Sequence, residues 1–394
     1  MKNSGRFPDL PEYPFTRLRA LLDGHAPGGE VIHMSIGEPQ HGFPEWVVKV
    51  IAEHSGEFGR YPPNDGAPEL LEAIADWIFR RYGVRLPADR RIIALNGTRE
   101  GLFNACLALC PVRSGDRRRT AVLIPNPFYQ VYAAAALACD AEPVYVPATA
   151  GTGFMPDYAG LAPETLDRVG VAYLCSPANP QGTVAPRDYL ADLIALAERH
   201  GFLVFSDECY SELYAGEPPV GALQVAAETG ASPERVVVFN SLSKRSNLAG
   251  LRSGFVAGGP EGIARVRQLR AYGGAPPPLP LQRAAARVWR DEAHVDENRN
   301  LYRAKYRLAD ELFGEVPDYA SCGAGFFLWL RVGDGEAAAL KLWREAGLRV
   351  LPGAYLGREV DGFNPGSEYI RAAMVAPIDE LGRGLGRLRD CVYS

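Results

Sequence analysis

The chain has 394 residues, 47% of them hydrophobic and 23% charged, and this length is enough for two domains of a soluble globular protein. Its formal net charge of -5 argues against nucleic acid or an anionic membrane surface as a partner. No segment approaches the ~20 apolar residues of a membrane span, and residues 1–15 lack the apolar core of a signal peptide, so we expect a cytoplasmic location.

Short apolar runs alternate with helical patterns through the middle of the chain. The runs cover residues 91–97, 120–125, 170–176, 201–207, 235–241 and 253–259, and helical patterns cover residues 100–110, 129–138 and 187–201. Runs that are apolar on both faces are typical of the strands of a parallel sheet covered by helices on both sides. The pattern therefore predicts an α/β fold with a mostly parallel central sheet.

A proline-rich segment at residues 273–282 interrupts this alternation. A long amphipathic region follows it, and the remaining residues mix strand patterns at 325–332 and 369–375 with helical patterns at 337–347 and 381–392. Such a mixture is typical of a smaller α+β domain. We expect a large domain at residues 46–282 and a discontinuous small domain formed by residues 1–45 and 283–394.

Polar residues follow several of the apolar runs, at the strand ends where open α/β sheets bind ligands. "NGTRE" at residues 96–100 opens a helix and could cradle a phosphate, or it could be an ordinary helix N-cap. Phe128 and Tyr129 could cover a flat ring, and Asn179 follows the next run. Asp207 and Tyr210 come after the run at 201–207, where a buried carboxylate is costly unless it meets a cation, which an arginine or a helix N-terminus could also supply.

The segment "NSLSKRSNLAGLRSG" at residues 240–254 supplies the complementary groups. Its serine hydroxyls and Arg252 suit a phosphate. A lysine screened from water at a strand end has a lowered pKa and can attack an aldehyde, although a lone lysine such as Lys244 is usually a solvated surface charge.

Together these residues predict a site for pyridoxal 5'-phosphate. The expected phosphate contacts are Gly97, Thr98, Arg99, Ser241, Ser243 and Arg252. Asp207 would hold the proton of the pyridinium nitrogen, Asn179 and Tyr210 would contact the ring oxygen, and Lys244 would join the aldehyde.

The chain resembles the class I and II aminotransferases of the type I pyridoxal-phosphate fold along nearly its whole length. The resemblance rests on "SIGEP" at 35–39, "RYPPNDGAPELLEAIADW" at 60–77, "NGTRE", "PNPFY", "SPANPQG", "SDECYSELY", "SLSKRSNLAGLRSGF" and "YIRAAM". "YPFTRLRALL", "SLSKRSNL", "LRSGFVAG" and "YLGREVDGFNPG" are similar to the succinyldiaminopimelate aminotransferases of proteobacteria.

The resemblance implies roles for individual residues. It makes Lys244, Asp207 and Tyr210 catalytic, with Tyr129 stacking on the cofactor ring. Tyr61 would reach a phosphate in the neighbouring subunit, which implies a homodimer with shared active sites. The substrate would be held by Arg371 at its α-carboxylate, by Asn179 and by the backbone of Gly37.

The expected reaction is a ping-pong transamination that converts glutamate to 2-oxoglutarate and passes through the pyridoxamine form of the cofactor. The expected acceptor is N-succinyl-2-amino-6-oxopimelate, in lysine and diaminopimelate biosynthesis. Arg299, Arg303 and Arg358 are candidates, by charge alone, for its distal carboxylate.

Two departures from the family pattern concern this assignment. Ala249 stands where the family usually has proline, and Gly273 stands where succinyldiaminopimelate enzymes tend to have histidine. Another aminotransferase, with acetylornithine, aspartate or aromatic specificity, and a pyridoxal-dependent C–S lyase remain alternatives. A nicotinamide dehydrogenase is disfavoured because no G-x-G-x-x-G follows a strand pattern, and a regulatory protein because only some thirty residues precede "SIGEP".

The seven cysteines show neither C-x-x-C pairs nor histidines at metal-ligand spacing. We expect reduced, mostly buried thiols and no metal site.

Overall fold

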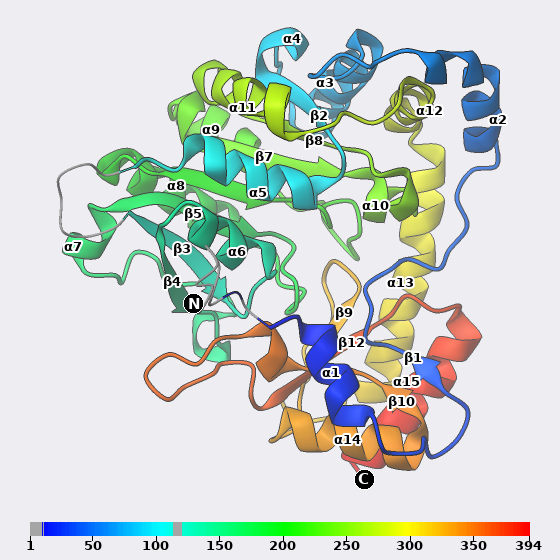
Figure 1. The fold of residues 1–394 in the computed structure, drawn as a ribbon. Coiled ribbons are helices and arrows are strands. Elements are labelled where there is room, and N and C mark those ends of the chain that lie inside the picture. Colours follow the sequence, from blue (N-terminus) through cyan, green and yellow to red (C-terminus); the bar gives the residue numbers. More distant parts are fainter. Residues whose placement is uncertain (1–9, 11, 113–119) are drawn as a thin grey trace, which may run out of the picture.

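The computed structural model describes residues 10, 12–112 and 120–394. A seven-stranded sheet forms its centre, in the order β2-β8-β7-β6-β5-β3-β4 (Figure 1). These strands are β2 (Ile92–Leu95), β3 (Ala121–Asn126), β4 (Glu142–Pro147), β5 (Val169–Cys175), β6 (Leu203–Asp207), β7 (Val236–Ser241) and β8 (Gly254–Ala257). Six of them match the predicted apolar runs. The sequence missed β4, whose Pro143 and Pro147 weaken the strand pattern and are tolerated because β4 is an edge strand.

The central sheet is mostly parallel, as predicted, but β8 runs antiparallel to both of its neighbours. The chain returns from β7 to β8 through the short helix α10 (Leu242–Arg245) and the 3-10 turn η4 (Ala249–Leu251). This connection is not a crossover helix of the kind that would make β8 parallel to β7. The amino end of β8 therefore lies at the same edge of the sheet as the carboxyl ends of the other strands.

Alternating residues of the strands pack on two separate faces. On one face they contact α3 (Pro68–Tyr82), α8 (Arg187–His200), α9 (Ala222–Thr229) and α12 (Leu279–Arg290). On the other face they contact α5 (Thr98–Leu109), α6 (Val131–Ala138) and α11 (Pro260–Gly273). The strands are therefore buried on both sides, which is why their sequences read as continuous apolar runs.

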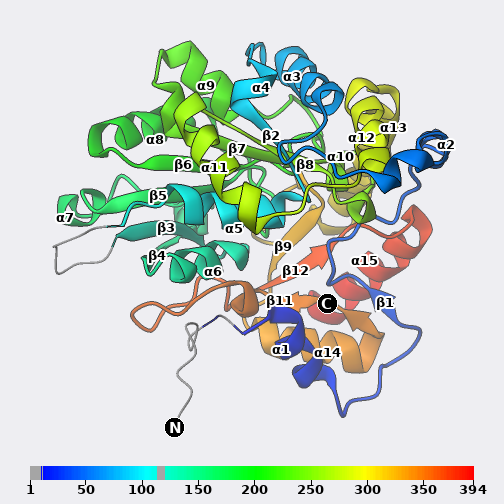
Figure 2. The same ribbon diagram turned by 45° about the horizontal axis from the view of Figure 1, so that its top comes forward.

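A second, smaller sheet has the antiparallel order β11-β12-β9, formed by β9 (Phe327–Arg331), β11 (Leu351–Pro352) and β12 (Tyr369–Ala373). It shares a core with α13 (Ala293–Phe313), α14 (Gly335–Ala346) and α15 (Ile378–Val392). The N-terminal segment joins this part through α1 (Pro14–Leu22) and through β1 (Ile32–His33), which pairs with β10 (Leu348–Arg349). Figures 1 and 2 show this part beside the large sheet, with α13 running between the two.

The remaining helices are short or peripheral. They are α2 (Trp46–Glu53), α4 (Ala88–Arg91) and α7 (Pro163–Leu166), with 3-10 turns η1 (Ser55–Gly59), η2 (Ala150–Thr152), η3 (Pro233–Arg235) and η5 (Gly353–Leu356). Residue 282 lies inside α12, which packs against α2 and α3. The expected division into domains stays a prediction, and a boundary between α12 and α13 would fit this packing better than one at 282. Among the described residues, no helix has both the length and the apolar character needed to cross a membrane.

Candidate active site

A cavity of about 490 Å³ lies where the predicted site residues meet. All of those residues line it except Gly97 and Tyr61. The lining residues among them are Gly37, Thr98, Arg99, Tyr129, Asn179, Asp207, Tyr210, Ser241, Ser243, Lys244, Arg252 and Arg371. The carboxyl ends of the large sheet supply most of them, while Gly37 and Arg371 come from the N-terminal segment and the small sheet.

Lys244 lies in α10, directly after β7. Ser241 caps this helix, because its Oγ accepts a hydrogen bond from the backbone N–H of Ser243. The Lys244 Nζ donates a hydrogen bond to the Gly37 carbonyl oxygen at 2.5 Å and lies 5.3 Å from the ring centre of Phe326. Burial lowers the pKa of Lys244 to about 8, although the charge of Glu38 opposes this shift. An amine with this pKa is mostly protonated near physiological pH, but its neutral fraction is much larger than that of an ordinary lysine and can act as a nucleophile.

Asp207 ends β6 and is only 4% exposed. Its Oδ2 accepts a hydrogen bond of 2.8 Å from the Tyr132 hydroxyl, and its Oδ1 accepts one of 3.4 Å from the Cys209 N–H. Burial raises the pKa of this carboxyl, and the hydrogen bonds and the nearby Lys244 only partly oppose the shift. A carboxylate in this position would be stabilised by a cationic N–H donor. The sequence did not point to Tyr132, which sits inside a helical alanine run without a motif of its own.

The expected phosphate contacts meet between the start of α5 and the loop before β8. The Arg252 guanidinium donates hydrogen bonds to the carbonyl oxygens of Ala249 and Asn96, at 2.8 and 3.2 Å. It also occupies the space beside Gly97: a Cβ at that glycine would lie 1.9 Å from the Arg252 Nη2. Gly97 has φ +84°. It is therefore needed both for its backbone conformation and to let the guanidinium approach, although it does not line the cavity itself.

Ala249 begins the turn η4 and lines the cavity. The first position of such a turn suits proline, because its N–H needs no partner there. Alanine keeps the carbonyl that holds Arg252, so this departure removes no group from the cavity. Gly273 does not line the cavity, and a Cβ there would meet nothing within 4 Å.

Arg99 and Tyr129 form a pair at the mouth of the cavity. The Arg99 Nε donates a hydrogen bond of 2.7 Å to the Tyr129 hydroxyl. This bond raises the pKa of the guanidinium, and Tyr13 acts on it in the same direction. The Arg99 side chain is thus held toward Tyr129 and Tyr13.

Arg371 projects from β12 and is 4% exposed. Its Nη1 donates to the Asn179 Oδ1 at 2.8 Å, its Nη2 donates to the Ser35 carbonyl oxygen at 2.7 Å, and its guanidinium lies 4.1 Å from the ring centre of Phe327. Its buried Nε has no hydrogen-bond partner among the described residues. Burial lowers the pKa of this guanidinium to about 10. Both terminal nitrogens keep a second N–H for a bound carboxylate.

The arginines proposed on charge alone, Arg299, Arg303 and Arg358, do not line this cavity. Arg299 donates to Glu212 at 3.0 Å and to Asp296 at 2.6 Å. Arg303 donates to Ala215 and Asn300, and neither it nor Arg358 lines the cavity. Tyr61 is also outside the cavity and is fully exposed, at 102% of its reference area.

The sequence analysis missed several residues that line the cavity. They are Tyr13, Pro14, Phe15, Ile36, Glu38, Gln130, Cys175, Cys209, Gly250, Phe327 and Leu356. Glu38 belongs to the motif "SIGEP", but the sequence offered no reason to assign its carboxylate a role in binding. Residues 13–15 and 356 belong to "YPFTRLRALL" and "YLGREVDGFNPG", which carry part of the resemblance, but a single sequence does not show that these distant segments meet at the cavity.

These residues fit pyridoxal 5'-phosphate. A partly buried lysine, a buried carboxylate whose pKa is raised by the loss of water, and an arginine set against a glycine surround one cavity. Among the described residues, Lys244 and Arg252 donate hydrogen bonds to backbone carbonyl oxygens, and Asp207 accepts them from a hydroxyl and a backbone N–H. None of the three forms a salt bridge there, so each can bind a reactive or charged group of the cofactor.

Comparison with known proteins identifies relatives along the whole chain. Residues 29–387 match the family model for aminotransferases of class I and II. The LL-diaminopimelate aminotransferase of Desulforudis audaxviator is 32% identical, over 98% of this chain and 97% of that protein. An aminotransferase structure from Neisseria meningitidis has a TM-score of 0.94 and 36% identity, with both chains fully covered. A structure from Thermus thermophilus described as a "probable N-succinyldiaminopimelate aminotransferase" has a TM-score of 0.83 and 26% identity, over 96% of this chain and 99% of that one.

Proposed function

Since the chain belongs to the class I and II aminotransferases and is a pyridoxal-phosphate-dependent enzyme, we propose that it transfers the amino group of glutamate to a dicarboxylic acid of the diaminopimelate type. The observation that carries this proposal is the set of cations in one cavity. Lys244 and Arg252 are assigned to the cofactor and Arg371 to an α-carboxylate, which leaves Arg99 for a second carboxylate.

Different residues would bind different parts of the cofactor. When bound, pyridoxal 5'-phosphate supplies an aldehyde that accepts an amine and a pyridinium ring that withdraws electrons. Asp207 would keep the proton on the ring nitrogen, and the Tyr132 hydroxyl fixes the orientation of that carboxylate. Gly97, Thr98, Ser241, Ser243 and Arg252 would hold the phosphate, Tyr129 would cover the ring, and Asn179 and Tyr210 would contact the ring oxygen.

Lys244 supplies the base of the reaction. With a substrate in the cavity, its Nζ would accept the proton from the substrate Cα. Its lowered pKa suits this task, because an amine with a pKa of about 8 is unprotonated in a useful fraction and still basic enough to accept a proton. The Gly37 carbonyl oxygen, 2.5 Å from the Nζ, keeps the amine near the cavity floor.

Arg371 orients the substrate. Two parallel N–H···O bonds to the α-carboxylate fix both the charge and the plane of the amino acid. Asn179 and the Ser35 carbonyl hold the guanidinium in place, so the fork is already positioned before substrate binds.

Arg99 and Glu38 are the charged residues that we assign to the end of the substrate distant from the α-carboxylate. Arg99 is the cation available to the distal carboxylate of glutamate or of a longer dicarboxylic acid. Glu38 is an acid that also lines the cavity and can bind an ammonium group. The sequence favours the succinylated acceptor, whose distal amine is blocked. Glu38, and the similarity to the LL-diaminopimelate aminotransferase of Desulforudis audaxviator, favour LL-diaminopimelate as a second candidate, because its distal end carries both an ammonium group and a carboxylate.

A substrate panel tests the proposed function. The purified enzyme is assayed with glutamate and the succinylated keto acid, with LL-diaminopimelate and 2-oxoglutarate, and with acetylornithine, aspartate and aromatic donors. The proposal expects one of the first two pairs to have the highest kcat/KM. A higher kcat/KM with acetylornithine or an aromatic donor, or release of a thiol from a cysteine conjugate, would refute it.

Variants of the two distal residues make the test specific. Arg99→Gln should lower kcat/KM for glutamate by about tenfold to a hundredfold, since one charge-assisted hydrogen bond contributes about 1.5–3 kcal/mol, and should change that for alanine little. Arg303→Gln is the matched control, because Arg303 lies outside the cavity. Glu38→Gln should reduce activity with LL-diaminopimelate but not with the succinylated acid. Equal losses for glutamate and alanine in Arg99→Gln would exclude the proposed role of Arg99.

We also propose a homodimer in which Tyr61 contacts the phosphate bound by the partner subunit. This role would explain why a tyrosine is fully exposed and absent from the cavity of its own chain. Mixing Tyr61→Ala chains with Lys244→Ala chains should create hybrid dimers in which one site has both native residues. Recovery of activity above that of either variant alone supports shared sites, and no recovery in verified hybrids contradicts them. The expected cytoplasmic location stays a prediction.

A further inference from the structure

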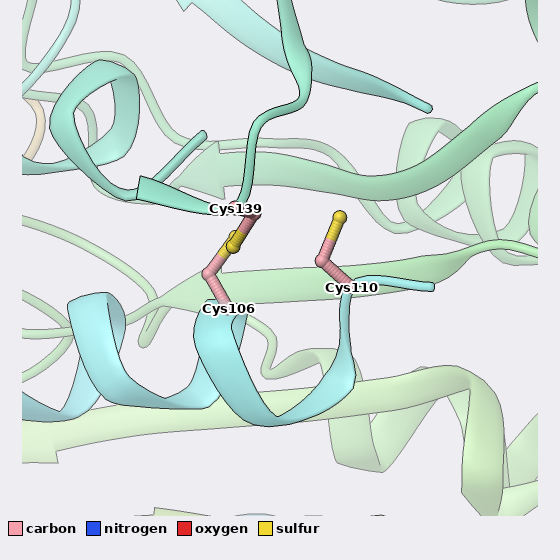
Figure 3. A group of neighbouring side chains, drawn as sticks. All are labelled: Cys106, Cys110 and Cys139. Atoms are coloured by element: carbon pink, nitrogen blue, oxygen red, sulfur yellow. The ribbon is translucent and has the colours of Figure 1, made fainter. Parts of the chain in front are cut away.

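Three of the seven cysteines gather at the end of α5 that lies away from the cavity (Figure 3). Cys106 and Cys110 are one helical turn apart, in α5 and at its C-cap, and Cys139 is the C-cap of α6. The packing of α5 against α6 brings Cys139 to the other two. The sequence did not reveal this cluster, because 28 residues lie between Cys110 and Cys139 and the spacing matches no metal-binding motif.

The distances between the sulfur atoms are those of a metal-binding cluster. The Sγ atoms of Cys106 and Cys139 are 3.6 Å apart, and all three Sγ atoms lie within 4.8 Å of one another. Zinc–thiolate bonds of ~2.3 Å place the sulfurs of a tetrahedral site roughly 3.8 Å apart. Small rotations about the side-chain bonds would therefore bring the three sulfurs to one ion.

The chemistry of the cluster selects for soft ions. Its three members offer thiol sulfur alone, without imidazole or carboxylate, and thiolates favour Zn²⁺ and Cu⁺ over Mg²⁺ or Ca²⁺. Cys106 is buried, while Cys110 and Cys139 are partly exposed, so an ion can enter from solvent.

Without a cation, the thiols of Cys106 and Cys110 keep their protons. Contacts with Cys110 and Cys139, together with burial, raise the pKa of Cys106. Hydrogen bonding to Cys106 lowers the pKa of Cys110, but Cys139 and burial more than offset this and raise it to about 12. Metal binding would therefore release protons, as it does at other thiolate sites.

We propose that Cys106, Cys110 and Cys139 bind one thiophilic metal ion, Zn²⁺ or Cu⁺, as three thiolates. Three S–H bonds lose their protons to solvent, three metal–sulfur bonds form, and no atom changes its oxidation state. α5 extends from Thr98 at the cavity to Leu109, and a helix rises about 1.5 Å per residue, so the ion would lie roughly 16 Å from the cavity. This site is independent of the proposed function and has no part in transamination.

The test uses the reduced, metal-free holoenzyme and Cd²⁺ as a spectroscopic probe. Titration should give a thiolate-to-metal charge-transfer band that saturates at one ion per chain. Cys106→Ser and Cys139→Ser should each lose that band. Cys391→Ser is the matched control, because Cys391 is a partly exposed cysteine on α15 outside the cluster, and it should retain the band in full.

Two further measurements make the outcome decisive. Competition against chromophoric chelators, with Zn²⁺ in one arm and Cu⁺ in the other, identifies the ion, and retention of neither overturns the proposal. The bound ion should also raise the melting temperature of the native chain but not that of Cys106→Ser. Cofactor absorbance reports whether each variant is folded. A folded Cys106→Ser variant with an undiminished band would likewise overturn the proposal.

Discussion

Replacing Arg371 with leucine should greatly weaken the binding of the substrate α-carboxylate. The native guanidinium is buried, and Asn179 and the Ser35 carbonyl hold its two terminal nitrogens at 2.8 and 2.7 Å. Its position is therefore fixed before substrate arrives, and little conformational entropy is lost when the carboxylate binds. Leucine has similar bulk but cannot donate a hydrogen bond.

The magnitude follows from the two bonds that are lost. Each charge-assisted hydrogen bond contributes about 1.5–3 kcal/mol, so two contribute about 3–6 kcal/mol. At about 1.4 kcal/mol for each factor of ten, kcat/KM should fall by roughly a hundredfold to ten-thousandfold for every amino-acid donor. Arg371→Lys keeps the charge but loses the planar fork, so its loss should be smaller.

The assay is the first half-reaction, followed by the absorbance change of the cofactor at increasing glutamate concentration. Arg331→Leu is the matched control, since Arg331 lies on the adjacent strand β9 but binds Asp318 and Glu368 at the surface. Melting temperature and cofactor content check the fold, because Arg371→Leu also leaves Asn179 and Ser35 without their donor. A folded, cofactor-loaded Arg371→Leu enzyme with kcat/KM within threefold of the native value would refute the reasoning.

Three other predictions concern the cofactor site and the core. Because the pKa of Lys244 is lowered from 10.5 to about 8, the folded chain loses this proton at lower pH than the unfolded chain. Reconstitution of the cofactor-free protein with pyridoxal 5'-phosphate should therefore accelerate with a midpoint near pH 8, and a midpoint near the ordinary lysine value would contradict this. Gly97→Ala should weaken cofactor binding at least tenfold, by equilibrium dialysis, because the new Cβ would displace Arg252. Gly83→Ala, at φ +71° with open space around it, should show only the ~1–2 kcal/mol strain of a left-handed residue and no cofactor loss. Trp77→Ala should lower the free energy of unfolding by about 3–5 kcal/mol in urea, since Trp77 is buried between Phe255 and Trp289, and a loss below 1 kcal/mol would contradict this packing.

The strand ends were predictable because each carries its own local signal. Buried strands read as apolar runs, and the residues after them must lie at one edge when the strands are parallel. Asp207 and Lys244 follow this rule directly. Arg252 does not, because it precedes β8, and it reaches the same edge only because β8 is antiparallel.

Contacts between segments distant in sequence were not predictable. Charge alone pointed to Arg299, yet Glu212 and Asp296 already bind that guanidinium. The sequence predicts Arg99 as a phosphate contact, and that stays a prediction. Its hydrogen bond to the Tyr129 hydroxyl could not be predicted, because it depends on how α5 packs beside α6. The same packing brings Cys139 to Cys106. A single sequence shows which residue types are present but not which helices meet.

Most residues assigned to the cofactor and most residues assigned to the substrate come from different parts of the fold. Asp207, Ser241, Lys244 and Arg252 all come from the large sheet and its loops, whereas Arg371 comes from the small sheet. Residues 13–15 and 36–38 of the N-terminal segment also face the cavity. We therefore expect substitutions at residues 13–15 to change the accepted substrate with less effect on the cofactor site than a substitution at Gly37, whose carbonyl oxygen binds Lys244. Arg99 is the exception, because it belongs to α5 at the phosphate end and yet is held toward Tyr13. If Arg99 selects dicarboxylic substrates, exchanging Tyr13 for phenylalanine should shift the ratio of glutamate to alanine activity while leaving cofactor affinity unchanged, which a role of Arg99 confined to the phosphate would not produce.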